Sequence, residues 1–211
     1  MLFKDRNEAG EALARALEGF QHDEVVVYAL PRGGVPLGVE VAPAIEAPLD
    51  LLIVGKLGHP LQPERSAGAV SEECSLVIRP EVKESLDPAW LDQEIERQVK
   101  EAQKRRALYL PGGEPVPVGG KTALIVDDGI ASGDTMKAAI LAVQARYASQ
   151  VVVAVPVAPR SVVEELGSLA DEVVVLHALE TFEGAIGSYY QDFPKISDGE
   201  VIRLLELVSK P

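Results

Sequence analysis

Residues 121–136 join a short apolar segment, two adjacent carboxylates, a run of small residues and the start of a helix. Residues 122–126 are apolar and largely β-branched, as expected of a buried strand, and Asp127 and Asp128 follow at once. The small residues behind the acids let backbone N–H groups close around an anion, and a helical pattern begins at Thr135. Carboxylates accept hydrogen bonds from hydroxyls, whereas amides and a helix N-terminus hold anions. The stretch therefore predicts a site for a ligand with sugar hydroxyls and a phosphate.

Other interpretations of this stretch are weaker. Residues 119–122, Gly-Gly-Lys-Thr, are similar to the end of a P-loop, but the earlier glycine of that motif would fall on Pro115. The tetrapeptide also precedes a strand instead of following one. A phospho-acceptor receiver domain would begin near the acid pair, and too little of the chain follows it. An acidic surface turn stays open as an alternative, although it leaves the small residues and the helix unexplained.

Residues 123–135 resemble the phosphoribosyl pyrophosphate (PRPP) binding motif of the type I phosphoribosyltransferases, in which an apolar strand leads to two acids and a small-residue loop ending in Thr. The resemblance implies that Asp127 and Asp128 hold the ribose hydroxyls, directly or through the water shell of a Mg²⁺ ion. The residues that it implies for the 5′-phosphate are Ala131, Ser132, Gly133, Asp134 and Thr135. The implied reaction transfers the 5-phosphoribosyl group of PRPP to a ring nitrogen of a base-like acceptor and releases pyrophosphate, with Mg²⁺ as the cofactor.

A second glycine-bearing turn follows the predicted strand at residues 25–29. Arg32, Gly33 and Gly34 lie in this turn, which opens the next helix. In type I enzymes this position is the pyrophosphate loop, so the resemblance assigns Arg32 and the amides of the two glycines to pyrophosphate. The family also leads us to expect a cis peptide near the Arg32–Gly33 bond. Taken alone, a tight turn with a surface arginine explains the same residues equally well.

A further cation, Lys56, lies just past the next predicted strand, residues 49–54. The family places a second cation against pyrophosphate here, and a solvated loop lysine is the alternative. The implied catalytic residues are Arg32, Lys56, Asp127 and Asp128. Because carbocation character develops at C1 of the ribose, these groups would mainly position the reactants and stabilise charge on both sides of that carbon.

The order of predicted elements indicates an α/β fold. Continuous apolar runs, typical of buried parallel strands, occur at residues 25–29, 49–54, 122–126, 151–155 and 172–176. Helical segments alternate with them, which predicts a Rossmann-like parallel sheet with helices on both faces and a lid or hood elaboration. Ligands of such sheets bind beyond the carboxyl ends of the strands. The loops that follow these ends are 30–34, 55–58, 127–135 and 156–159, so we expect one convergent pocket.

The length of 211 residues fits a single domain with an elaboration. We expect a core at about residues 7–58 and 119–177, an inserted loop, hairpin and long helix at about 59–118, and a C-terminal hood at about 178–211.

Outside the predicted sheet, the patterns indicate packing and covering elements. A helix at residues 7–19, capped by Asn7, is expected to pack on the core and to carry no site. Residues 60–66 are polar and contain proline, and we interpret them as the start of the mobile loop that covers the active site in this family. The remaining insertion is expected to form a hairpin of 67–70 with 75–78 and a helix from 87 to about 108.

The acceptor is less well determined. Hypoxanthine-guanine enzymes carry an Asp three residues after the second acid, where this chain has Ala131, so a 6-oxopurine is less favoured and adenine, a pyrimidine or an unusual acceptor stays open. The charge of Asp134 must point out of the phosphate cup, since it would otherwise repel the phosphate. Aromatic residues gather in the tail, where they could stack on a base or, more simply, pin the tail to the core: Phe182, Tyr189, Tyr190 and Phe193.

Composition limits the possible partners. The net charge of −13 argues against a general nucleic-acid surface, and the clearest cluster of cations is Lys104-Arg105-Arg106. No apolar run approaches the roughly 20 residues of a membrane span, and no apolar leader is evident, so a cytoplasmic protein without a membrane partner is expected. Cys74 is the only cysteine, which excludes an intrachain disulfide and a zinc site built on several thiolates.

Three functions stay open at this stage. The first is the phosphoribosyltransferase of nucleotide metabolism described above, a homodimer by family habit. The second is a PRPP-binding regulatory protein without turnover. The third is a hydrolase that acts on a ribose phosphate or a nucleotide.

Overall fold

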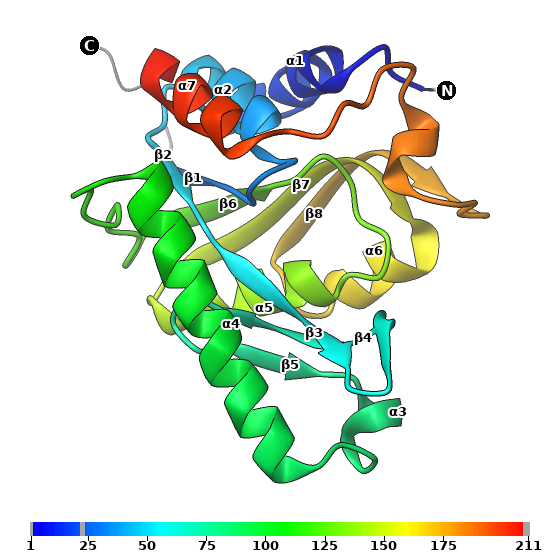
Figure 1. Ribbon diagram of the computed structural model, residues 1–211. Helices are drawn as coiled ribbons and strands as arrows, with labels where there is room; N and C mark the ends of the chain where they lie inside the picture. The colour runs from blue at the N-terminus through cyan, green and yellow to red at the C-terminus, as the bar shows by residue number, and fades with distance from the viewer. Residues whose placement is uncertain (1, 22–23, 209–211) are drawn as a thin grey trace.

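The computed structural model describes residues 2–21 and 24–208, with residues 63–65 described by their backbone alone. Its centre is a five-stranded parallel sheet in the order β2-β1-β6-β7-β8 (Figure 1). The bounds are β1 (Val25–Ala29), β2 (Leu49–Leu51), β6 (Thr122–Val126), β7 (Gln150–Pro159) and β8 (Glu172–Leu179).

Helices cover both faces of this sheet, which confirms the predicted fold class. One face packs against α1 (Arg6–Ala16) and α2 (Val35–Ala44), and the other against α5 (Asp134–Ala145) and α6 (Arg160–Leu166). Alternate residues of one strand enter the two cores: Val27 of β1 joins the first core and Val26 the second. Because both faces are buried, the strand sequences are apolar throughout.

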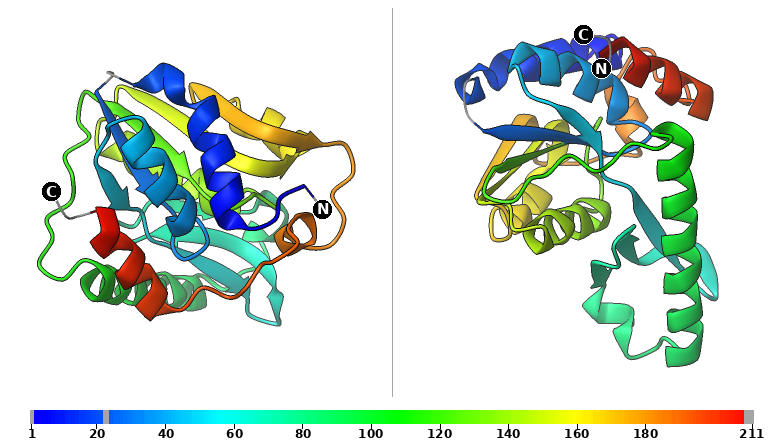
Figure 2. Two further views of the ribbon diagram at one scale, coloured as in Figure 1. Left: turned by 90° about the horizontal axis from the view of Figure 1, so that it is seen from above. Right: turned by 90° about the vertical axis from the view of Figure 1, so that its left-hand side faces the viewer.

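The segment between β2 and β6 builds a separate layer that projects away from the parallel sheet, as the right-hand view of Figure 2 shows. It contains an antiparallel sheet, β3 (Val54–His59), β4 (Gln62–Ser71) and β5 (Leu76–Ile78), followed by α3 (Pro80–Lys83) and the long α4 (Pro88–Tyr109). Its own apolar cluster holds Leu57, Ala67, Val70, Val82 and Leu86, with one side of α4 packed against it. The insertion is thus an arm with its own apolar core.

The C-terminal part returns to the parallel sheet. A short turn of 3₁₀-helix at Ile186–Tyr189 precedes α7 (Asp198–Val208), and another, Glu18–Phe20, follows α1. Ser197 accepts a hydrogen bond from the backbone N–H of Glu200 at the start of α7, and α7 packs beside α2 and α4. Among the described residues, no helix combines the length and apolarity needed to cross a bilayer.

The predicted start of the first helix and the predicted loop at residues 60–66 are wrong. Helix α1 begins at Arg6, one residue early, because Asp5 and not Asn7 caps it by accepting from the N–H of Glu8 at 2.9 Å. Residues 60–66, predicted as a loop, lie largely in β4, which pairs with β3. Lys56 accordingly sits within β3 and not in a loop after β2.

The predicted loop at residues 156–159 is also wrong, because β7 continues to Pro159. Beyond Ala154 the strand pairs only with β8, since β6 ends at Val126 opposite Ala154. Pro156 and Pro159 lack an N–H donor and lie beyond the end of β6, where the backbone N–H of Ile130 donates to the carbonyl oxygen of Val157 at 2.9 Å.

Candidate functional site

The carboxyl ends of β1 and β6 lie side by side, which brings the turn after β1 onto the acid pair after β6. A Cβ on Gly33 would stand 2.2 Å from Oδ2 of Asp128, and one on Gly34 2.5 Å from the carbonyl oxygen of Val126. Only glycine permits this approach. The turn contains a cis peptide between Pro31 and Arg32, one bond before the expected position.

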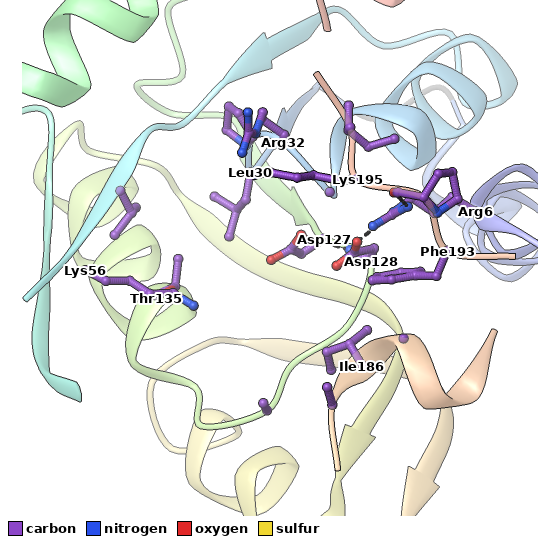
Figure 3. Close-up of a pocket in the computed structure, with 18 of the residues that line it drawn as sticks. Arg6, Leu30, Arg32, Lys56, Asp127, Asp128, Thr135, Ile186, Phe193 and Lys195 are labelled. Carbon is purple, nitrogen blue, oxygen red and sulfur yellow. Dashed lines mark hydrogen bonds and ion pairs between the residues drawn. The ribbon is translucent and has the colours of Figure 1, made fainter. Parts of the chain in front are cut away.

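A cavity of about 910 Å³ opens beyond these strand ends (Figure 3). Predicted site residues that line it are Arg32, Gly33, Lys56, Asp127, Asp128, Ala131 and Thr135. The two aspartates lie in the middle of the view, with Lys56 and Thr135 on one side and Arg6 and Phe193 on the other. An adjoining cavity of about 180 Å³ adds Ser132 and Gly133. Gly34 and Asp134 line neither cavity.

The surroundings of Asp127 and Asp128 shift the pKa values of both carboxyls. Burial raises the pKa of Asp127 well above its usual value, and the neighbouring charge of Asp128 raises it further. Burial also raises the pKa of Asp128, although the charge and hydrogen bond of Arg6 act against this. Lys56 favours the ionised form of both carboxyls. Because the charged form of the pair is disfavoured, a bound cation or bound hydroxyl donors would stabilise it.

Arg6, at the start of α1, is a site residue that the sequence analysis missed. Its Nε donates to Oδ2 of Asp128 at 2.8 Å and its Nη1 to the carbonyl oxygen of Pro194 at 2.8 Å. Its guanidinium lies 3.5 Å from the ring centroid of Phe193. The side chain is buried although it is charged. Arg6 lies on the same core-facing side of α1 as Ala9 and Leu13. A cation among apolar residues at helical spacing is the sequence signal that could have identified Arg6 as a site residue.

The small residues after the acids form a cup at the N-terminus of α5. Gly133, with φ +79°, is the N-cap, and a Cβ there would also contact Val162 at 2.9 Å. The left-handed backbone at this residue turns the chain into the helix, whose free N–H groups face the cup. Thr135, in the first turn, lines the main cavity.

Asp134 points away from this cup and toward the insertion. Its Oδ2 accepts from Nε of Arg79 at 2.9 Å, from Oγ of Ser66 at 2.8 Å and from Oγ of Ser132 at 3.2 Å. These groups border a third cavity of about 410 Å³ that also includes Lys56. The carboxylate is only 4% exposed, so Arg79 compensates a charge that water does not.

The aromatic residues of the tail divide between two roles. Tyr190 is buried against Phe3 and donates its hydroxyl proton to the carbonyl oxygen of Asp128 at 2.6 Å. The rings of Phe182 and Tyr189 pack in a tilted arrangement, with their centroids 5.4 Å apart. Phe193 lines the main cavity, where Ile186 supplies a second apolar side chain. Tyr190 therefore anchors the tail, and Phe193 is the tail aromatic that faces the cavity.

The chain matches a family model described as "Phosphoribosyl transferase domain" over residues 4–192. A protein named "Putative phosphoribosyl transferase" from Mycobacterium tuberculosis, found in two strains, is 43% identical over 207 residues, which are 97% of this chain and 46% of that protein. The chain thus spans about half the length of these relatives. A crystal structure of a protein from Thermus thermophilus is 38% identical and superposes with a TM-score of 0.83 over 100% of both chains.

Proposed function

The chain belongs to the phosphoribosyl transferase family, and on this premise we propose that it transfers the 5-phosphoribosyl group of PRPP to a nitrogenous base or a related acceptor, with Mg²⁺ as cofactor and release of pyrophosphate. One observation carries the proposal. A glycine turn with a cation, an acid pair and a helix N-terminal cup converge on one cavity of about 910 Å³. This combination matches the three parts of PRPP.

Each part of the cavity has a role in this reaction. The amides and hydroxyls of residues 131–135, together with the positive end of α5, hold the 5′-phosphate. Asp127 accepts hydrogen bonds from the ribose hydroxyls, and Arg6 orients Asp128 beside it. Arg32 and Lys56 bind the pyrophosphate group. With both ends held, the ribose C1 faces the acceptor side, which aligns the reactants for displacement.

The acid pair fits a magnesium ion in its donor chemistry. Oδ1 of Asp127 accepts from the N–H of Asp128, and Oδ2 of Asp128 accepts from Arg6. The other carboxylate oxygen of each residue accepts no hydrogen bond from any other residue whose side chain the structure describes. Hard oxygen donors of this kind suit Mg²⁺, directly or through water. When bound, Mg²⁺ would supply charge neutralisation to the leaving pyrophosphate.

The acceptor would enter between the tail and the acid pair. Ile186 and the ring of Phe193 offer an apolar wall there, and Ala131 leaves room opposite the second acid. A planar heterocycle buries well against such a wall. We propose adenine, a pyrimidine or another nitrogenous ring as the acceptor.

The test is to follow PRPP by ³¹P nuclear magnetic resonance with Mg²⁺ and a panel of purine, pyrimidine and other nitrogen heterocycles. We expect PRPP to give equal amounts of pyrophosphate and one phosphomonoester, and only when an acceptor is present. Asp128→Asn should slow this reaction at least about 100-fold, because a group that acts on the reacting ribose is lost. Asp92→Asn, on an exposed position of α4, is the matched control and should leave the rate unchanged.

Two results would contradict the proposal. PRPP that binds and stays intact with every acceptor would indicate a regulatory protein. Ribose 5-phosphate and pyrophosphate formed equally fast without an acceptor would indicate a hydrolase.

A further inference from the structure

Helix α4 carries a row of polar side chains that faces the turn after β1, residues 30–34. The row follows helical spacing, at Gln98, Glu101, Arg105 and Tyr109, and Lys104 lies beside it. Gln98 and Arg105 line the main cavity. A second cavity of about 240 Å³ lies between this row, Arg32 and the start of α7. Arg32 and Arg105 line both cavities, so the two spaces adjoin at these side chains.

The cations of this second cavity have unused donors. Within the part of the chain that the structure describes, Lys104 has no hydrogen bond or ion pair, and Arg105 has a single contact, 3.7 Å from its Nε to Glu101. Arg32 makes one long contact, 3.4 Å from Nη1 to Asp198. Three cationic side chains thus converge on one space with most of their N–H groups free. Such groups recognise phosphate oxygens strongly.

The residues that line this second cavity carry a net positive charge. Glu101 and Asp198 give two negative charges against the three positive ones. Oδ1 of Asp198 is also engaged by the hydroxyl of Tyr109 at 2.6 Å, and the pKa of Tyr109 is raised to about 12 by burial and by this contact, so the phenol stays neutral. The balance favours an anion next to Arg32.

We infer that Lys104 and Arg105 of α4 complete, with Arg32, an accessory anion subsite that accepts the pyrophosphate group. The inference rests on the proposed function. It assigns to α4 a direct part in ligand binding, through residues outside the motifs that bind PRPP. The three consecutive cations 104–106 then have two roles. Lys104 and Arg105 bind the anion, whereas Arg106 points to the parallel sheet and donates to Asp50 and to the carbonyl oxygen of Leu51.

The test compares two ligands by calorimetry: inorganic pyrophosphate with Mg²⁺, and ribose 5-phosphate. The variant Lys104→Gln/Arg105→Gln should bind pyrophosphate at least about tenfold more weakly than the wild type, because charge-assisted hydrogen bonds are lost. It should bind ribose 5-phosphate within about twofold of the wild type, since the cup at α5 is untouched. Both side chains are exposed, so the variant should unfold at the wild-type temperature.

A matched control is Arg97→Gln/Lys100→Gln. It removes the same charge from the same helix, but these residues pair with Glu94 and Glu96 and border none of the cavities described here. It should bind pyrophosphate like the wild type.

The outcomes separate the inference from the proposed function. If Lys104→Gln/Arg105→Gln binds pyrophosphate as tightly as the wild type, or is weakened no more than the control, the inference is wrong and the proposed function stands. If the wild type binds neither ligand, both are wrong.

Discussion

Asp127 carries a charge that the folded protein disfavours. Burial and the adjacent Asp128 raise its pKa above the value in the unfolded chain. The stability that this group contributes is present below the unfolded pKa and is lost as the pH rises through the raised folded pKa. At neutral pH the burial of this carboxyl therefore costs folding free energy, a cost that its proposed role in ligand binding explains.

Asp127→Asn should accordingly stabilise the protein at neutral pH while it weakens PRPP binding. Thermal unfolding at pH 7.5 should show a higher midpoint for the variant, by about 2–4 °C for each kcal/mol in a chain of this size. The difference should shrink as the pH falls through the raised pKa of Asp127, because the wild-type carboxyl then takes up a proton in the folded chain. A variant that unfolds at a lower temperature than the wild type at pH 7.5 would show that Asp127 stabilises the fold instead.

Asp134 places a buried negative charge next to the phosphate cup, and Arg79 compensates it. Arg79→Met should raise the KM for PRPP by about tenfold, because the uncompensated carboxylate repels the 5′-phosphate. Stability should fall by about 1–3 kcal/mol, less than for a fully buried pair since Arg79 is partly exposed.

The second variant, Arg79→Met/Asp134→Asn, separates charge from packing. It should recover most of the lost PRPP affinity, since neither charge remains. If the double variant binds PRPP as poorly as Arg79→Met alone, the effect is one of packing, and the electrostatic explanation fails.

At the scale of elements, buried charges fix α4 to the parallel sheet. Nη2 of Arg106 donates to both carboxylate oxygens of Asp50, at 2.8 and 3.1 Å, and Nη1 donates to Glu72 at 3.1 Å. Asp50 is 2% exposed and Glu72 6%. The position of α4, and with it the placement of Arg105 at the cavity, depends on this network.

Arg106→Gln should therefore destabilise the protein by about 3–5 kcal/mol, because it leaves the buried carboxylate of Asp50 without a cation, whereas Glu72 keeps Arg146 at 3.5 Å. Arg97→Gln, which opens an exposed pair on the same helix, should cost no more than about 0.5 kcal/mol. Denaturant unfolding measures both. Equal losses in the two variants would show that the buried network contributes nothing beyond a surface pair.

The elements that could be predicted are those specified by local sequence. Residues 122–126 show a continuous apolar pattern, and the acids and small residues follow in contiguous order, so the strand, the turn and α5 needed no distant information. The β3–β4 hairpin, in contrast, contains glycines and polar residues and is held by its antiparallel register and by contacts with α4. Patterning of single residues does not reveal such pairing.

The site was predictable only in its contiguous parts. Arg6 reaches Asp128 across 122 residues of sequence, and its position in the apolar stripe of α1 does not indicate which residue it contacts. Arg79 meets Asp134 in the same way, from the insertion. These contacts arise from packing of whole elements, which a single sequence does not display.

For the whole molecule, the distribution of charge agrees with an anionic ligand. The net charge is −13, yet the main cavity is bordered by five cationic side chains and two acidic ones. The cations are Arg6, Arg32, Lys56, Arg105 and Lys195. A positive cleft in an acidic protein concentrates the field where the ligand binds, and this attraction weakens as salt screens it over about 10 Å at 0.1 M.

The central claim is that this cavity binds PRPP through the acid pair, and calorimetric titration of PRPP with Mg²⁺ tests it most directly. The wild type should bind with one site per chain, and Asp127→Asn/Asp128→Asn should lose at least about 100-fold in affinity while remaining folded by circular dichroism. Asp92→Asn should bind like the wild type. A folded wild-type protein that shows no binding, or a double variant that binds equally well, would contradict the account.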